Sequence, residues 1–400
     1  MSDSRTRRLI LTCVAGLTAL LVVIIAGKSA FGKRAGQEAE THPVPVNLNE
    51  TLKNEMSDTS SLAGFDKMVQ NYLTYWGIHG ASISVMRNDS LLFAKGYGEA
   101  DSGKKMEPGN ILRMASVSKL VTAVGIMVLQ ERGLLNLKDH VFGPDGILND
   151  STYNAAIKDT LYYRITVEDL LRHKGGFSKR GGDPMFSTRW IMMQNGWSEV
   201  PSQERLMEVQ LKRRLKFVPG SAQEYSNFGY LALSMVIEKV SGMDYETFIQ
   251  ENVLRPVGCV DFHIAGNYYK HKFPNETRYY VQHDDEPAEE FNNSGRKVTR
   301  CYGGNNVTGL SGAGAWAAST PELALFVASI DGSPEVPDII SRESVDLMTE
   351  YFDENTYSLG WNDTKDGFWT RTGTFAGTSA LIKYFPDGEC WIFISNTSTY

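Results

Sequence analysis

The sequence has little of what a metalloprotein, a disulfide scaffold or a nucleic-acid-binding protein needs. Only four of its 400 residues are cysteine: Cys13 in an apolar N-terminal segment, then Cys259, Cys301 and Cys390. No pair has the spacing of a metal site, so we expect neither a metal nor a disulfide framework, although one bridge is left open. The net charge is -7 and no long basic run occurs, which argues against a nucleic-acid partner. No cofactor is expected.

The longest uncharged run lies near the N-terminus. Residues 9–27 carry no charge and follow three arginines within residues 1–8. A helix of this length just crosses the hydrocarbon core of a bilayer, and the run is long for the apolar core of a signal peptide. We therefore expect a cytoplasmic tail over 1–8 and a transmembrane anchor over 9–27, with a cleaved signal peptide as the alternative.

The polar composition of residues 28–60 indicates a linker, and residues 61–400 have the length and apolar content of a folded domain. If the anchor is correct, this domain lies outside the cytoplasm, on the periplasmic side if the protein is bacterial. Membrane contact is expected only through the N-terminal helix.

Periodicity within this domain predicts its elements. Apolar residues at helical spacing over 65–76 predict a helix that faces a core. Short apolar runs bounded by turn residues predict four strands, over 81–86, 91–95, 379–384 and 390–395. Helices and loops dominate between them, over about 135–310. Because the strands lie at both ends, we expect one sheet built from distant segments and a helical insertion, an α/β (α+β) fold.

The pattern Ser-x-x-Lys occurs three times, and its context separates the matches. Ser116 and Lys119 open a long apolar run that ends near Gly133, so both side chains share one face of a predicted helix. The matches at 102–105 and 294–297 have glycine directly after serine and lie in polar turns. A lysine whose charge is suppressed can take the proton of a serine hydroxyl. Taken alone, the motif is better explained as a helix N-cap serine with a solvated lysine one turn on.

Two further segments carry chemistry. Tyr225 and Asn227 stand on a predicted loop, where a tyrosine can shuttle a proton and an asparagine can bond an amide and a lysine. Arg371, Thr372 and Gly373 lie where a strand is predicted, and together they allow carboxylate binding with close backbone approach. Taken singly, these segments fit a buried tyrosine, a turn asparagine and a solvated edge arginine.

In this order, Ser-x-x-Lys, Tyr-x-Asn and a basic residue followed by Thr-Gly resemble the signature of the penicillin-binding-protein and class C β-lactamase superfamily. The resemblance covers roughly residues 65–398. Supporting stretches lie at 96–101, 169–176, 217–220, 225–230, 312–314 and 357–361. It implies a β-lactamase/transpeptidase-like fold, with an antiparallel sheet flanked by helices, a mostly helical domain and the site between them. It also implies a serine hydrolase.

The resemblance gives each site residue a role. Ser116 would be the acylated nucleophile. Lys119 would accept its proton, or would keep Tyr225 ionised so that Tyr225 is the base. Asn227 would position Lys119 and a substrate amide. Backbone N–H groups of Ser116 and Thr374 would form an oxyanion hole, worth about 3 kcal/mol per donor. The expected substrate-binding residues are Asn227, Arg371, Thr372, Gly373 and Thr374.

Three departures from the family pattern bear on the function. Arg371 stands where relatives usually have lysine or histidine. The planar guanidinium of an arginine favours binding of a planar carboxylate. The Glu-x-x-Leu-Asn box of class A β-lactamases is absent, and the helix that relatives place after the last strand has no counterpart before Tyr400.

We therefore expect a membrane-anchored, extracytoplasmic hydrolase that acts through acyl-Ser116 on a peptide, ester or amide. It would be a D-amino-acid peptidase or an esterase, with reactivity toward β-lactams left open. The substrate would be a small molecule or a peptide, cell-wall fragments included. A slow-deacylating penicillin-binding sensor is the alternative.

Overall fold

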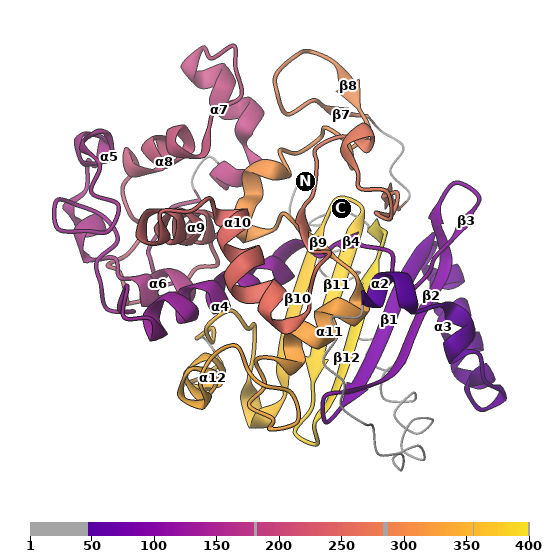
Figure 1. Cartoon of the computed structure of the whole chain (residues 1–400). Coiled ribbons are helices and arrows are strands. Elements are labelled where there is room, and N and C mark those ends of the chain that lie inside the picture. The colour runs from indigo at the N-terminus through magenta and orange to yellow at the C-terminus, as the bar shows by residue number, and fades with distance from the viewer. Residues whose placement is uncertain (1–46, 180–181, 283–286, 355, 399–400) are drawn as a thin grey trace.

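The structure is a computed structural model that describes residues 47–179, 182–282, 287–354 and 356–398 (Figure 1). The predicted cytoplasmic tail, 1–8, and transmembrane anchor, 9–27, lie outside the described residues. Within those described ranges, every helix is too short or too polar to span a bilayer.

A six-stranded antiparallel sheet joins the two ends of the described chain. In spatial order its strands are β10 (Trp369–Phe375), β11 (Thr378–Tyr384), β12 (Glu389–Ser395), β1 (Gly80–Arg87), β2 (Ser90–Asp101) and β3 (Lys104–Lys105). Strands β1 and β12 pair in continuous register, from Ala81 opposite Ser395 to Arg87 opposite Glu389. All four predicted strands are present, and the sheet is built from distant segments as expected. Strand β2 extends beyond the predicted run.

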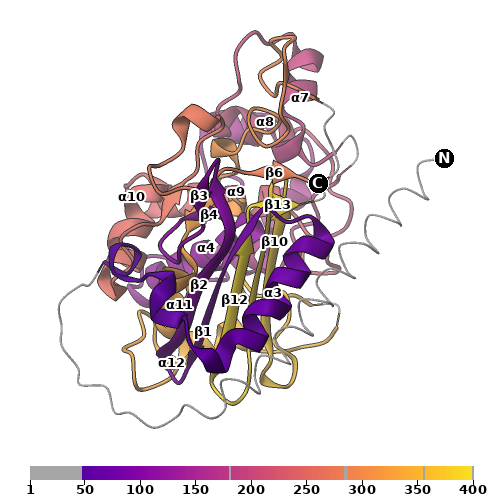
Figure 2. The ribbon, with the colours of Figure 1, turned by 90° about the vertical axis from the view of Figure 1, so that its right-hand side faces the viewer.

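Helices cover both faces of this sheet (Figure 2). On one face lies α3 (Ala63–Trp76), the predicted helix, which packs Phe65, Val69 and Leu73 against strand residues such as Phe393. It stops at Gly77, whose φ of 61° closes the helix. The opposite face meets α4 (Ser118–Glu131) and α11 (Thr320–Ala328) in the main core. The sheet is thus the middle layer between helices.

Between the two halves of the sheet, the regular elements are mainly helices, joined by long loops. The helices are α5 (Ser151–Ala156), α6 (Val167–Leu171), α7 (Thr188–Asn195), α8 (Gln203–Leu211), α9 (Asn227–Ser241) and α10 (Tyr245–Ile249), and α12 (Arg342–Thr349) follows α11. Thr166 caps α6 through a capping box with Asp169. Helix α9 packs on α4, and both are buried along most of their length.

Short strand pairs complete the fold. Strands β4 (Leu112–Arg113), β9 (Trp316–Ala318) and β5 (His263–Ile264) form a three-stranded sheet. Two pairs follow, β13 (Thr397–Ser398) with β6 (Tyr280–Val281), and β7 (Ala288–Glu289) with β8 (Lys297–Val298). Strand β4 leads directly into the turn that carries Ser116, so this small sheet fixes the approach to the predicted nucleophile. Cys259, Cys301 and Cys390 are free and buried.

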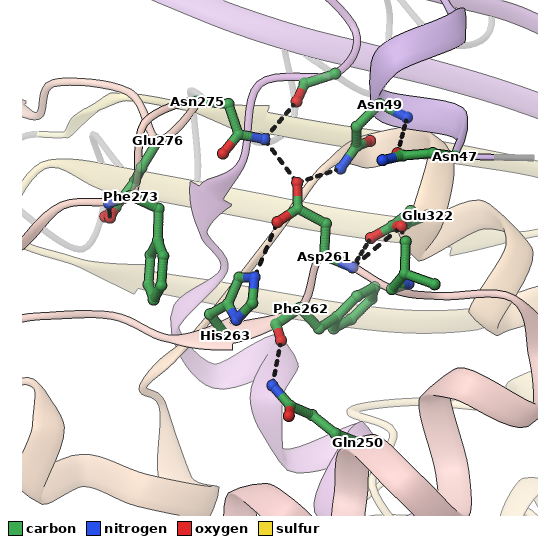
Figure 3. A network of polar contacts seen from close by, with 12 residues as sticks. Asn47, Asn49, Gln250, Asp261, Phe262, His263, Phe273, Asn275, Glu276 and Glu322 are labelled. Carbon is green, nitrogen blue, oxygen red and sulfur yellow. Dashed lines mark hydrogen bonds and ion pairs between the residues drawn. The ribbon is translucent and has the colours of Figure 1, made fainter.

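The segment predicted as the end of the linker, 28–60, is packed on the domain where it is described. Helix α2 (Leu48–Thr51) buries Asn49, whose Nδ2 donates to Asp261 Oδ2 at 2.7 Å (Figure 3). Asn275 donates to the same oxygen at 2.6 Å. Residues 47–60 of the predicted linker thus contact the domain, with Asn49 buried on the Asp261 carboxylate, a contact that polar composition alone does not reveal.

Candidate active site

Ser116 lies in a 3-10 turn, Ala115–Val117, immediately before α4. Ala115 has a φ of 47°, in the left-handed region that side chains other than glycine rarely adopt. Backbone strain of this kind persists only where the surroundings over-determine it, and it concentrates at functional sites. The Ser116 hydroxyl bonds to Lys119 and Tyr225, so the alternative of an N-cap serine does not describe it.

Lys119 is fully buried one turn after Ser116. Its Nζ is 3.3 Å from Ser116 Oγ, donates to Asn227 Oδ1 at 2.8 Å and also donates to the carbonyl of Ala313. Burial lowers the pKa of Lys119 to about 8, Arg371 acts in the same direction, and Tyr225 opposes both. Burial thus disfavours the charged form of Lys119, which is what a proton acceptor needs.

Tyr225 donates its hydroxyl to Ser116 Oγ at 2.8 Å. Burial opposes its ionisation, but the positive charges of Lys119 and Arg371 outweigh that effect and lower the pKa of Tyr225 to about 8. Because Lys119 and Tyr225 each shift the other, they titrate as a pair. This pair is placed to take the proton of Ser116. The acceptor is either neutral Lys119 or ionised Tyr225.

Asn227 is the first residue of α9, which Ser226 caps by accepting the N–H of Gly229 at 3.1 Å. The cap holds Asn227 in the first turn, with its side chain between α4 and the loop before α7. Its oxygen binds Lys119 and its Nδ2 donates to Asp183 Oδ2 at 2.8 Å. The structure thus brings the first two motifs into direct contact.

Arg371 occupies a different place from the expected one. Its guanidinium is fully buried and donates from Nε to the Ser116 carbonyl at 2.8 Å and from a second nitrogen to the same oxygen. The alternation of β10 turns Arg371 and Gly373 inward and leaves Thr372 and Thr374 half-buried. We therefore correct the predicted role of Arg371 from carboxylate binding to holding the Ser116 turn and lowering nearby pKa values.

Gly373 lies against this turn. A Cβ there would come within 2.3 Å of the Met114 carbonyl oxygen and 2.7 Å of the Ser116 nitrogen, so only glycine fits. The N–H of Thr372 points off the open edge of the sheet, where it donates to Asn362 Oδ1 at 2.7 Å. Strand alternation places the Thr374 N–H on the same edge. The oxyanion hole of Ser116 and Thr374 stays a prediction, with a geometry that allows it.

A polar cavity of about 990 Å³ opens beside these residues. Its lining includes Lys174, Gln223, Tyr357, Asn362 and Thr372. The Tyr357 ring centroid is 5.8 Å from that of Tyr225, so the cavity begins next to the reacting groups without enclosing Ser116 itself. A substrate bound at Ser116 could extend into it.

Three contributors to the site were missed or given no role from the sequence. Asp183 lies in a Gly-Asp-Pro turn that carries no motif, and the Ala313 carbonyl is a backbone group, although the Gly312–Gly314 stretch matched the family. His173 lies under Tyr225, with ring centroids 4.3 Å apart, and its Nδ1 accepts the N–H of Ser226. Burial lowers the pKa of His173 well below its usual value, which keeps it neutral.

The fold and the Ser–Lys–Tyr arrangement define a serine hydrolase of the penicillin-binding-protein type. A family model described as Beta-lactamase matches residues 65–398, and the chain belongs to this family. The predicted fold is confirmed.

The relatives have moderate identity. Penicillin-binding protein 4* of Bacillus subtilis (strain 168) is 27% identical over 187 residues, which cover 46% of this chain and 34% of that protein. The chain thus spans about a third of that relative. A protein of Escherichia coli (strain K12), provisionally named D-alanyl-D-alanine carboxypeptidase, is 24% identical over 364 residues, covering 82% and 79%.

Solved structures share the fold. The octameric penicillin-binding protein homologue from Pyrococcus abyssi has a TM-score of 0.62 at 23% identity, covering 84% of this chain and 73% of that one. D-amino acid amidase from Ochrobactrum anthropi SV3 has a TM-score of 0.64 at 16% identity, covering 85% and 93%.

Proposed function

We propose that the protein cleaves an amide, ester or peptide bond through a covalent acyl-Ser116 intermediate. Ser116 Oγ attacks the carbonyl carbon, and its proton passes to the Lys119–Tyr225 pair. The pair then returns a proton to the leaving group as the carbon–heteroatom bond breaks. Water, deprotonated by the same pair, then attacks the acyl carbon; the bond to Ser116 Oγ breaks, the pair returns the proton to Oγ, and the carboxylic acid leaves.

One observation carries this proposal: Ser116 Oγ receives the Tyr225 hydroxyl at 2.8 Å and lies 3.3 Å from Lys119 Nζ. The two proton-accepting groups have pKa values near 8 and contact the same oxygen. A serine that only capped a helix would need neither group.

The proposed substrates are small amides, peptides or esters whose acyl part carries a D-configured residue. Support comes from a relative that bears a D-alanyl-D-alanine carboxypeptidase name and from the fold shared with a D-amino acid amidase. The polar cavity beside Tyr357 suits a peptide better than a long acyl chain. We also propose that β-lactams acylate Ser116.

A fluorophosphonate probe tests the nucleophile. We expect labelling of the wild type at Ser116 and none of Ser116→Ala. Ser118→Ala is the neighbouring control: Ser118 Oγ accepts the N–H of Trp316 at 3.1 Å, so its loss lowers stability but keeps labelling. Equal labelling of the Ser116→Ala variant and the wild type would reject the proposal.

The lifetime of the acyl adduct separates a hydrolase from the alternative sensor. After labelling with a fluorescent penicillin and removal of excess probe, we expect the adduct to decay within minutes, with recovery of esterase activity. An adduct that persists for hours would identify a slow-deacylating receptor instead.

We also propose that residues 9–27 tether the catalytic domain to a membrane on its extracytoplasmic side. The uncharged run behind three arginines supports this placement. The full chain should remain in the membrane pellet after alkaline carbonate extraction, and a variant that starts at residue 28 should be released. Release of the full chain would exclude the anchor.

A further inference from the structure

The side-chain amide of Asn227 is held from both ends. Its oxygen accepts from Lys119 at 2.8 Å, and its nitrogen donates to Asp183 Oδ2 at 2.8 Å. A reversed amide would set its NH2 group against the lysine ammonium and its oxygen against a carboxylate, which is unfavourable at both ends. The Asp183 carboxylate therefore admits one orientation of Asn227.

Asp183 is itself held in place. It caps the 3-10 turn Pro184–Phe186, where its Oδ1 accepts the N–H of Met185 at 3.0 Å. Pro184 and Met185 are buried, which anchors the turn. One carboxylate oxygen thus serves the backbone and the other serves Asn227, so the side chain has little freedom to leave the site.

We propose that Asp183 is a positioning residue of the hydrolase. It orients Asn227 so that the Asn227 oxygen holds Lys119 beside Ser116, and one N–H of the amide stays free for a substrate carbonyl. The inference rests on the proposed role of Ser116 as nucleophile and extends it to a residue that contacts neither Ser116 nor the reacting bond.

The charge of Asp183 gives this role a distinct signature. Burial lowers the pKa of Lys119, Arg371 lowers it further, and Asp183 acts in the opposite direction together with Tyr225. Other titratable side chains among the described residues also face the pair: Lys179, 5.9 Å from the Tyr225 ring centroid, the neutral His173, Tyr230, whose ring centroid is 5.5 Å from Lys119 Nζ, and Tyr357. Removing only the charge of Asp183 should therefore move the acid limb of the pH profile to lower pH.

Asp183→Asn is the decisive variant. Asparagine caps a turn as well as aspartate, so the turn and the melting temperature should be kept. Its amide, however, sets a second NH2 group against that of Asn227 or leaves Met185 without its cap. We expect the fluorophosphonate labelling rate and kcat/KM for a short-chain aryl ester to fall about 10- to 100-fold.

Two comparisons isolate the mechanism. Asp150→Asn makes the same exchange at the cap of α5, where Asp150 accepts the N–H of Thr152 at 2.8 Å, and should change neither rate nor stability. In an Asn227→Ala background, Asp183→Asn should cause no further loss of kcat/KM on the pH plateau, because Asp183 positions Lys119 through Asn227, whereas the shift of the acid limb should persist, because the charge of Asp183 acts on Lys119 directly. Asp183→Glu, which keeps the charge, should recover part of the lost rate and the wild-type acid limb.

The outcomes that overturn the inference are specific. Wild-type labelling and ester kinetics in Asp183→Asn would remove the role of Asp183 and leave the proposed function intact. An equal loss with and without Asn227 would do the same, because it would show that Asp183 acts independently of Asn227. If the wild type shows no Ser116-dependent labelling, the proposed function itself fails, and the inference fails with it.

Discussion

The α-carbon of Gly373 lies so close to the backbone of Ser116 that a methyl group on it would come within 2.7 Å of the Ser116 nitrogen. The edge strand β10 and the turn that carries the nucleophile are therefore in direct backbone contact. The position of the Ser116 N–H relative to a bound substrate carbonyl therefore depends on the separation between β10 and the Ser116 turn.

Gly373→Ala should displace the Ser116 turn. Because the added methyl would meet backbone atoms of Met114 and Ser116, neither neighbour can move aside cheaply. We expect kcat/KM for an aryl ester to fall about 100-fold, the loss typical of a displacement near 1 Å, and stability to fall by about 1–3 kcal/mol. The control is Gly64→Ala in α3, which has open space around its Cβ and should leave activity unchanged. A fully active Gly373→Ala variant would show that the turn tolerates more room than the contact indicates.

The Lys119–Tyr225 pair predicts the pH profile. Both groups have pKa values near 8, so kcat/KM should rise with pH as the pair loses one proton around pH 8. Tyr225→Phe should lower kcat/KM about 10²- to 10⁴-fold. Because Tyr225 raises the pKa of Lys119, the residual acid limb should shift to lower pH. Tyr357→Phe, in the neighbouring ring, is the matched control and should keep the wild-type profile. An unshifted limb in Tyr225→Phe would contradict the coupling.

Loss of the Arg371 charge should shift the acid limb of the same pH profile in the opposite direction, to higher pH. It lowers the pKa of both Lys119 and Tyr225, so Arg371→Ala should raise both and move the acid limb above pH 8. Arg371→Lys keeps the charge but cannot donate twice to the Ser116 carbonyl; we expect the limb near its wild-type position and kcat/KM about tenfold lower. Melting temperatures separate this effect from unfolding. An acid limb that stays in place in Arg371→Ala would show that its charge does not reach the pair.

The three sequence motifs predicted which side chains meet at Ser116. They did not predict the backbone and loop groups that surround those side chains. Ser116, Lys119 and Tyr225 meet because one helical turn places residues three apart on one face and because α9 starts at Asn227, with Ser226 as its cap. Contacts that depend on the path of the backbone could not be predicted: the Ala313 carbonyl on Lys119 and the carboxylate of Asp183. Arg371 was misjudged for a related reason, since strand alternation decides whether a side chain faces the cavity or the core.

The N-terminal segment around α2, residues 47–60, gives predictions that concern stability rather than activity. Asn49 donates to Asp261 from a buried position on α2, so Asn49→Ala should cost about 1.5–3 kcal/mol of unfolding free energy and leave kcat/KM unchanged. Glu50→Ala, on the exposed side of the same helix, should stay within about 0.5 kcal/mol of the wild type. Urea unfolding measures both.

Truncation separates the packed segment from the residues before it. A variant that starts at residue 47 keeps α2 and should unfold at a higher urea midpoint than one that starts at residue 61, because the second exposes Asp261 and the surface under α2. If both variants unfold at the same midpoint, the segment contributes nothing to the fold and the original linker boundary stands. If only the longer variant unfolds at the urea midpoint of the full chain, the catalytic domain has to be defined from residue 47 onward.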